Sequence, residues 1–135
     1  MLAVPSTPIV TVRLGVRMAD LDPRGVVHNV SYLYFVDQAT IEAVHHVGVS
    51  SEEFSSVVHN NTIDYVRPLA AESVEVTTWV TRLGATYVTF AFHVHTGTVV
   101  HAHGHRTYVR IGAEGRPQRM PAVVRTALGT LLADG

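Results

Sequence analysis

One segment of this chain has apolar residues at helical spacing, whereas almost every other long segment alternates with a period of two. The residues at helical spacing are Tyr32, Phe35, Val36, Ala39, Ala43 and Val47. The apolar arc is widened by Leu33, Ile41 and Val44, so a helix here should be enclosed on most sides. Gly48 is a suitable end for it. The rest of the chain must therefore supply a sheet that covers one apolar helix.

The segments on either side of this helix have the period of β-strands. Residues 10–18 alternate before it, and the later alternating segments are residues 57–67, 74–81, 88–94 and 99–111. Residues 82–84 interrupt the pattern, residues 95–98 resemble a hairpin turn, and a short helix is expected over residues 122–132. This order predicts one α+β domain over residues 1–135, in which a curved antiparallel sheet is wrapped around one long central helix.

The composition excludes several classes of function. The 135 residues include no cysteine, so disulfides, thiolate nucleophiles and thiolate metal sites are absent. A formal net charge of −1 gives no support for binding nucleic acid or an anionic membrane. No window approaches the roughly 20 apolar residues of a membrane helix, and the first residues lack the pattern of a signal peptide. We therefore expect a soluble, cytoplasmic protein. Because only 16% of residues are charged, we also expect a homo-oligomer.

The stretch DLDPRGVVHNVSY, from Asp20 to Tyr32, joins the first strand to the helix. Its Asp-Pro-x-Gly segment, which begins at Asp22, is the signature of a type I turn. The first turn of a helix has unpaired N–H groups and a partial positive charge, which suit an oxyanion. Asp22 and these donors could therefore flank one carbonyl group, and Gly25 would let a substrate approach the backbone closely. The local sequence leaves a plain turn and a reactive carboxylate both open.

The neighbouring polar residues have their own alternatives. Asp20 is expected to be structural, either within the turn or paired with Arg17 or Arg24. We expect the helix to be capped through the side chain of Asn29, or by Ser31 as a rival cap one residue inside. The sequence does not separate these arrangements.

Nine histidines invite a metal hypothesis. Five of them lie on two neighbouring strands: His93, His95, His101, His103 and His105. Two imidazoles at i and i+2 on a strand can bind zinc. A two-residue hairpin loop would place the two sets on opposite faces, and a loop with an odd residue count would bring them together. Because no acid is adjacent, a solvated or interface-lining sheet face is favoured, and we expect no metal.

The longer stretch DLDPRGVVHNVSYLYFVDQAT resembles the signature of the hotdog-fold acyl-CoA thioesterases, in the branch similar to 4-hydroxybenzoyl-CoA thioesterase. The matching positions are Asp20, Asp22, Gly25, Val27, His28, Asn29 and Tyr32. The resemblance continues in IDYVRPL, TRLG and GRPQRMP, so it covers almost the whole chain. It departs from the commonest pattern at His28, where Asn, Tyr or Phe is more usual, and this leaves the role of His28 open.

The resemblance implies a hotdog fold, homodimers that often pair into tetramers, and hydrolysis of an acyl-CoA or acyl-carrier-protein thioester at the subunit interface. It implies that Asp22 is the catalytic carboxylate, either as nucleophile or as general base. The oxyanion donor is then the amide of Asn29, with Val30 next to it. Gly25, Val30 and Tyr32 are the expected substrate-binding positions, and no cofactor is needed. Two alternatives are a non-catalytic acyl-thioester-binding module and a dehydratase acting on 3-hydroxyacyl thioesters.

Other residues are weaker candidates. His28 is either part of the site or an ordinary capping or interface histidine, and Asp37 faces either the acyl pocket or a partner subunit. The arginines that could meet the phosphates of coenzyme A are Arg67, Arg82, Arg106 and Arg110. The aromatic residues that could line the acyl pocket are Tyr32, Phe35, Tyr65 and Trp79.

Overall fold

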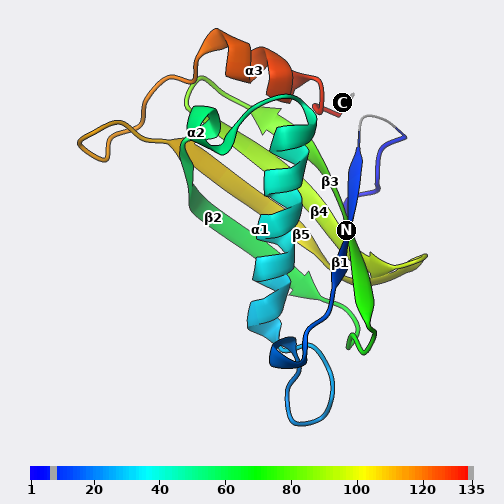
Figure 1. The fold of residues 1–135 in the computed structure, drawn as a ribbon. Helices are drawn as coiled ribbons and strands as arrows, with labels where there is room; N and C mark the ends of the chain where they lie inside the picture. Colours follow the sequence, from blue (N-terminus) through cyan, green and yellow to red (C-terminus); the bar gives the residue numbers. More distant parts are fainter. Residues whose placement is uncertain (7–8, 134–135) are drawn as a thin grey trace.

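A five-stranded antiparallel sheet curves round one long helix, α1 (Figure 1). The computed structural model describes residues 1–6 and 9–133. Its elements are β1 (Val10–Gly15), η1 (Met18–Asp20), α1 (Asn29–His46), α2 (Ser51–Phe54), β2 (Ser56–Tyr65), β3 (Ser73–Leu83), β4 (Tyr87–Thr96), β5 (Val99–Arg110) and α3 (Ala122–Gly129). The strand order is β1-β3-β4-β5-β2. The predicted α+β architecture is therefore confirmed.

The core lies between α1 and the concave face of the sheet. The sheet residues buried there include Val74, Val76, Val80, Val88, Phe90 and Phe92. From α1, Phe35, Ala39 and Ala43 are fully buried against them. Each fully buried large apolar side chain contributes about 1.5–3 kcal/mol. This packing fixes the position of α1 on the sheet, and with it the position of the first turn of the helix.

Only one side of α1 is covered by its own sheet. On the other side Val30, Tyr34 and Ile41 are 63%, 42% and 36% exposed. The prediction of a helix enclosed on most sides is therefore wrong for a single chain. The physical reason is that, in the part of the chain that the structure describes, the sheet is the only layer large enough to cover α1, and it lies on one side of the helix (Figure 1). No helix within the described ranges is long and apolar enough to cross a membrane.

Two element ends differ from the sequence prediction. β1 ends at Gly15 instead of continuing to Met18, because Met18 begins a single 3-10 turn. The Asp20 amide closes this turn by donating to the Arg17 carbonyl, and the Arg17 amide caps it by donating to the Asp20 carboxylate. Helix α3 ends at Gly129, three residues before the predicted end.

Two further features were not predicted. β3 passes through the expected break and runs to Leu83, because a bulge between Val80 and Arg82 absorbs the change of register. Helix α2 is a single turn with a capping box, in which the Ser50 hydroxyl accepts from the Glu53 amide and the Glu53 carboxylate accepts from the Ser50 amide. The Ser-x-x-Glu spacing is the sequence signal for this turn.

The hairpin between β4 and β5 decides where the histidines lie. The loop has two residues, with Thr96 opposite Val99, but a register shift just after it leaves His101 as an extra residue in β5. The extra residue moves the following residues of β5 to the opposite face of the sheet, as a loop with an odd residue count would. His93 therefore lies directly opposite His103, with ring centroids 6.2 Å apart.

Three of the five histidines of this hairpin, His93, His95 and His101, are hydrogen-bonded to polar groups of the chain itself. The buried His93 ring is hydrogen-bonded to the carbonyl of Leu2 at 2.8 Å, and burial lowers its pKa. The buried His101 ring contacts the Thr96 hydroxyl and the carbonyl of Pro68. Across residues 1–6 and 9–133, no group of three or more His, Cys, Asp or Glu side chains is arranged to hold a metal ion.

Candidate active site

The predicted turn at Asp22 forms, and it closes a small loop. The Gly25 amide donates to the Asp22 carbonyl at 2.9 Å, and Gly25 has φ +80°, which few other residues adopt without strain. The Asp22 amide donates to the carbonyl of Val26, and a bridge between Leu21 and Val27 closes the loop behind it. Figure 1 shows this loop projecting beyond the first turn of α1.

The helix start differs from the prediction. The N-cap is His28, whose backbone is extended, and Asn29 is the first residue inside the helix. His28 makes no side-chain capping bond, so the predictions of Asn29 or Ser31 as the cap are wrong. The reason is tertiary: the Ser31 hydroxyl donates to the buried Asp20 carboxylate, and the His28 amide donates to the Asp20 carbonyl.

The first turn of α1 offers two backbone donors. The Ser31 amide donates to the His28 carbonyl at 3.1 Å. Within the described residues, no backbone or side-chain group accepts from the amides of Asn29 or Val30. These two N–H groups carry the partial positive charge of the helix N-terminus, so they suit a developing oxyanion.

Both oxygens of the Asp22 carboxylate are occupied. Oδ1 accepts from the backbone amides of Arg24 at 2.8 Å and Val26 at 3.3 Å. Oδ2 accepts from the Arg24 guanidinium, through Nη2 at 2.8 Å and Nε at 3.2 Å. The Arg24 side chain is the largest cause of a lowered pKa of Asp22, and the two amides add to it. Asp22 is therefore a carboxylate at neutral pH.

Asp20 holds the base of the same loop. Its side chain is 1% exposed, and it accepts from the Arg17 amide at 2.7 Å, the Arg17 guanidinium at 2.9 Å and the Ser31 hydroxyl at 2.9 Å. These bonds, led by the Arg17 side chain, lower the pKa of Asp20 to about 2. Arg17 is thus the partner of Asp20, and Arg24 is the partner of Asp22.

The lowered pKa of Asp20 predicts a loss of stability in acid. The carboxylate stabilises the folded state fully above its unfolded pKa of about 3.9, and the contribution is lost as the pH falls from about 5 to about 2. We expect the unfolding midpoint of the wild type to fall over this window. Asp20→Asn should be less stable at pH 7 and show a smaller change with pH. Parallel curves for the two proteins in thermal unfolding followed by circular dichroism would contradict this role.

A hollow of about 260 Å³ opens beside the first turn of α1. Its lining consists of Arg24, Val26, Val27, Asn29, Tyr32, Tyr65, Val66, Arg67 and Pro68. The Tyr65 hydroxyl donates to the Asn29 carbonyl at 3.1 Å, and the Tyr65 ring meets the Tyr32 ring edge to face at 5.1 Å. Of the predicted site residues, the structure brings Asn29 and Tyr32 together here.

The other predicted site residues lie near the hollow without lining it. They are Asp22, Gly25, His28 and Val30. The ring of His28 lies 3.3 Å from the Ser31 hydroxyl, which belongs to the Asp20 network. Arg24 was expected only as a possible partner of Asp20, and its pairing with Asp22 beside the hollow was not predicted. Its signal is its position two residues after Asp22, inside the same turn.

Two of the aromatic candidates lie elsewhere. Phe35 is fully buried in the core, and Trp79 lies on the outer face of the sheet, 5.5 Å from the His93 ring. Neither lines the hollow, so the prediction that they line the acyl pocket is not supported. The period of two in β3 explains Trp79, because its neighbours Thr78 and Val80 face the opposite side of the sheet.

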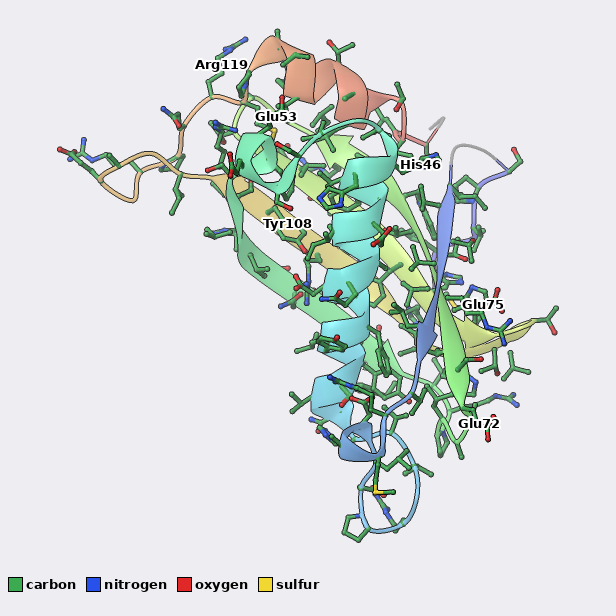
Figure 2. All side chains as sticks on the ribbon, viewed as in Figure 1. His46, Glu53, Glu72, Glu75, Tyr108 and Arg119 are labelled. Atoms are coloured by element: carbon green, nitrogen blue, oxygen red, sulfur yellow. The ribbon has the colours of Figure 1, made fainter. Side chains whose placement is uncertain are left out.

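Arg106 is also unavailable to phosphates at the surface. It is 4% exposed and donates to Asp37 Oδ1 at 3.0 Å, to Asn61 Oδ1 at 2.8 Å and to the Leu33 carbonyl at 3.2 Å. The side chain of Tyr108 extends from β5 towards the helices α1 and α2 (Figure 2). Its hydroxyl accepts from Arg106 and donates to Asp37. Asp37 and Tyr108 line a second cavity of about 200 Å³, next to Phe54 of α2.

Known proteins share this fold and part of this sequence. A model of the thioesterase superfamily matches residues 24–103. A Thermus thermophilus thioesterase, solved in complex with coenzyme A and zinc, is 29% identical, with a TM-score of 0.81 over 90% of this chain and 92% of that one. A second Thermus thermophilus protein is 23% identical, with a TM-score of 0.85 over 94% and 100% of the two chains. A 1,4-dihydroxy-2-naphthoyl-CoA thioesterase from Synechocystis is 19% identical, with a TM-score of 0.81 over 92% and 98%. No curated protein matches the chain significantly.

Proposed function

Because this chain belongs to the thioesterase superfamily and has its hotdog fold, we propose that it hydrolyses acyl-CoA thioesters with Asp22 as the reacting carboxylate. One observation carries this proposal. An ionised carboxylate lies in a short loop that leads directly into a helix whose first two amides have no acceptor in the described residues. The complex of the 29% identical relative with coenzyme A supports this thiol carrier.

The two parts of the site have separate tasks. The amides of Asn29 and Val30 donate to the thioester oxygen as charge develops on it, which lowers the energy of the tetrahedral state. The hollow beside them receives the substrate, with Tyr32 and Tyr65 as its aromatic wall. Burial raises the pKa of both tyrosines, so they stay neutral and present hydroxyl groups and ring faces. Gly25 leaves the backbone of the loop open to the substrate.

Asp22 acts by one of two balanced routes. As nucleophile, a carboxylate oxygen adds to the carbonyl carbon, the C–S bond breaks, and coenzyme A leaves as a thiolate. Water then hydrolyses the mixed anhydride, which returns the carboxylate and releases the acid. As general base, Asp22 removes a proton from water while the water oxygen adds to the same carbon, the C–S bond then breaks, and the proton held by Asp22 passes to the departing thiolate. Both routes consume one water and give one acid and one thiol.

The test of this function is thiol release from a panel of thioesters. The panel contains acetyl-, hexanoyl-, lauroyl- and benzoyl-CoA, together with one acyl carrier protein loaded with hexanoate. We expect turnover of at least one member, measured with a thiol reagent. The protein itself adds no thiol background, because it has no cysteine. Binding of acyl-CoA in calorimetry without any thiol release would instead support a binding module and would contradict the proposal.

We also propose that two copies of the chain associate through β2. This strand forms one edge of the sheet and, among the described residues, pairs only with β5. It exposes apolar side chains, with Val57 48%, Val58 42% and Tyr65 48% exposed. Helix α1, whose outer side is also exposed, lies across the concave face of the same sheet (Figure 1). A long edge strand with exposed apolar residues is unfavourable in a monomer. Pairing two β2 edges would remove this surface from water, and a tetramer would be a pair of such dimers.

The expected result is a solution mass of two or four times 14.7 kDa. Val58→Lys places a charge on the β2 edge and should shift the protein towards the monomer in light scattering coupled to gel filtration. Val99→Lys is the matched control, since Val99 is a similarly exposed valine (39%) at the hairpin end of β5. A wild-type mass equal to one chain, or equal effects of the two variants, would overturn this assembly.

A further inference from the structure

The two oxygens of the Asp22 carboxylate are held in different ways. Oδ1 is held by two backbone amides that belong to the turn, those of Arg24 and Val26. These amides can leave Oδ1 only if the turn itself changes shape. Oδ2 is held by one side chain, the guanidinium of Arg24. This oxygen becomes free when that one side chain rotates.

We infer that Oδ2 is the reacting oxygen of Asp22 and that Arg24 is a positioning residue that covers it in the resting enzyme and moves aside for the thioester. The inference rests on the proposed role of Asp22 and adds to it which atom reacts and what restrains it. Oδ1 keeps the carboxylate oriented throughout, because its backbone donors do not depend on the Arg24 side chain.

The pair between Arg24 and Asp22 is weak enough to open in every turnover. The Arg24 side chain is 83% exposed, and that of Asp22 is 16% exposed. Ion pairs exposed to this degree contribute little, because water and salt compete for both partners. Arg24 also lines the hollow beside the first turn of α1, so a substrate that fills the hollow contacts the side chain that must move.

The same pair limits reactivity. A carboxylate oxygen that accepts two charge-assisted hydrogen bonds is a poorer base and nucleophile than a free one. Arg24 therefore has opposite effects at low and at neutral pH. It lowers the pKa of Asp22, which keeps more of the carboxylate ionised in acid, and it restrains the ionised carboxylate once all of it has formed. The other cationic residue of the hollow, Arg67, makes no hydrogen bond to Asp22 in the structure.

Arg24→Gln tests the inference, with Arg116→Gln as the matched control. Arg116 is an equally exposed arginine, 84% exposed, and its nearest acid is Glu114 at 3.9 Å. With hexanoyl-CoA or benzoyl-CoA at pH 7, we expect Arg24→Gln to raise kcat two- to fivefold, equivalent to about 0.4–1 kcal/mol. The acid limb of its kcat profile should move to higher pH, so that the profiles of variant and wild type cross. Arg116→Gln should leave both unchanged.

Salt gives a second readout without mutation. Raising the ionic strength screens an exposed ion pair. Sodium chloride should therefore raise kcat of the wild type towards that of Arg24→Gln, while kcat of the variant stays nearly constant. Equal responses of the two proteins would overturn the inference.

A readout that is independent of turnover separates this inference from the proposed function. The Asp22 carboxyl carbon can be titrated by NMR in protein labelled with ¹³C-aspartate, and its pKa should be higher in Arg24→Gln than in the wild type. An unchanged pKa, or a variant with lower kcat at every pH, would overturn the role of Arg24. Turnover that survives loss of the Asp22 carboxylate would instead contradict the proposed function, whatever the result for Arg24.

Discussion

Asp22→Asn is expected to reduce kcat for acyl-CoA hydrolysis at least about a hundredfold, equivalent to a loss of roughly 2.7 kcal/mol of transition-state stabilisation. An asparagine side chain can neither take a proton from water at neutral pH nor form a mixed anhydride, so both routes fail. Its oxygen still accepts from the amides of Arg24 and Val26, so the turn should be kept. Thiol release at saturating substrate is the measurement.

The control for this prediction is Glu114→Gln, which neutralises a carboxylate that is 81% exposed and pairs only loosely with Arg116. It should retain full activity. If Asp22→Asn keeps more than a tenth of wild-type kcat, the turn is structural and another group does the chemistry. In the wild type, single turnover in ¹⁸O-labelled water identifies the nucleophilic route when solvent oxygen appears in the Asp22 carboxylate, because the general-base route places it only in the product acid.

Gly104→Ala is expected to destabilise the fold by about 3 kcal/mol, because the added methyl group meets backbone. A Cβ at this position would lie 1.8 Å from the carbonyl oxygen of Thr62 and 2.8 Å from its carbonyl carbon. Gly104 pairs with Ile63 on β2 and Phe92 on β4, so neither neighbouring strand can move away without breaking its own ladder. We expect the thermal midpoint to fall by roughly 10 °C.

Gly15→Ala is the matched control, since it makes the same substitution in β1 with no atom within 4 Å of the added Cβ. Its thermal midpoint should stay within about 2 °C of the wild type, as is usual for a surface substitution. A Gly104→Ala protein that unfolds at the same temperature as Gly15→Ala would show that the β2–β5 pair can separate there at little cost. Failure of Gly104→Ala to accumulate as soluble protein, with Gly15→Ala well expressed, agrees with the prediction.

Local patterns predicted the elements that depend on neighbouring residues. The period of two in β3 and β4, and the helical spacing from Tyr32 to Val47, each report which face of an element is buried, and burial of that face is what stabilises the element. The turn at Asp22 was predicted for a similar reason, because Pro23 fixes φ at the second turn position and Gly25 permits the positive φ at the fourth. The family resemblance then indicated Asp22, Asn29 and Tyr32 as site residues.

Errors arose where distant residues compete for the same group. Ser31 was a reasonable cap by sequence, but its hydroxyl is taken by the buried carboxylate of Asp20. The end of β1 was misplaced because a bond from Arg17 to Asp20 starts a new turn there. The histidine faces depended on a single extra residue, His101, and a bulge changes register without any clear sequence signal.

The sequence by itself determined the period of each element, the turn that holds Asp22 and the family to which the chain belongs, because these follow from residues close together in the chain. Only the tertiary structure decided which arginine pairs with which acid. Arg17 and Arg24 are both near Asp20 and Asp22 in sequence, but Asp20 is turned inward to Ser31 and Asp22 outward to the turn. The direction of each carboxylate depends on the packing of α1 against the sheet, which is a property of the whole fold.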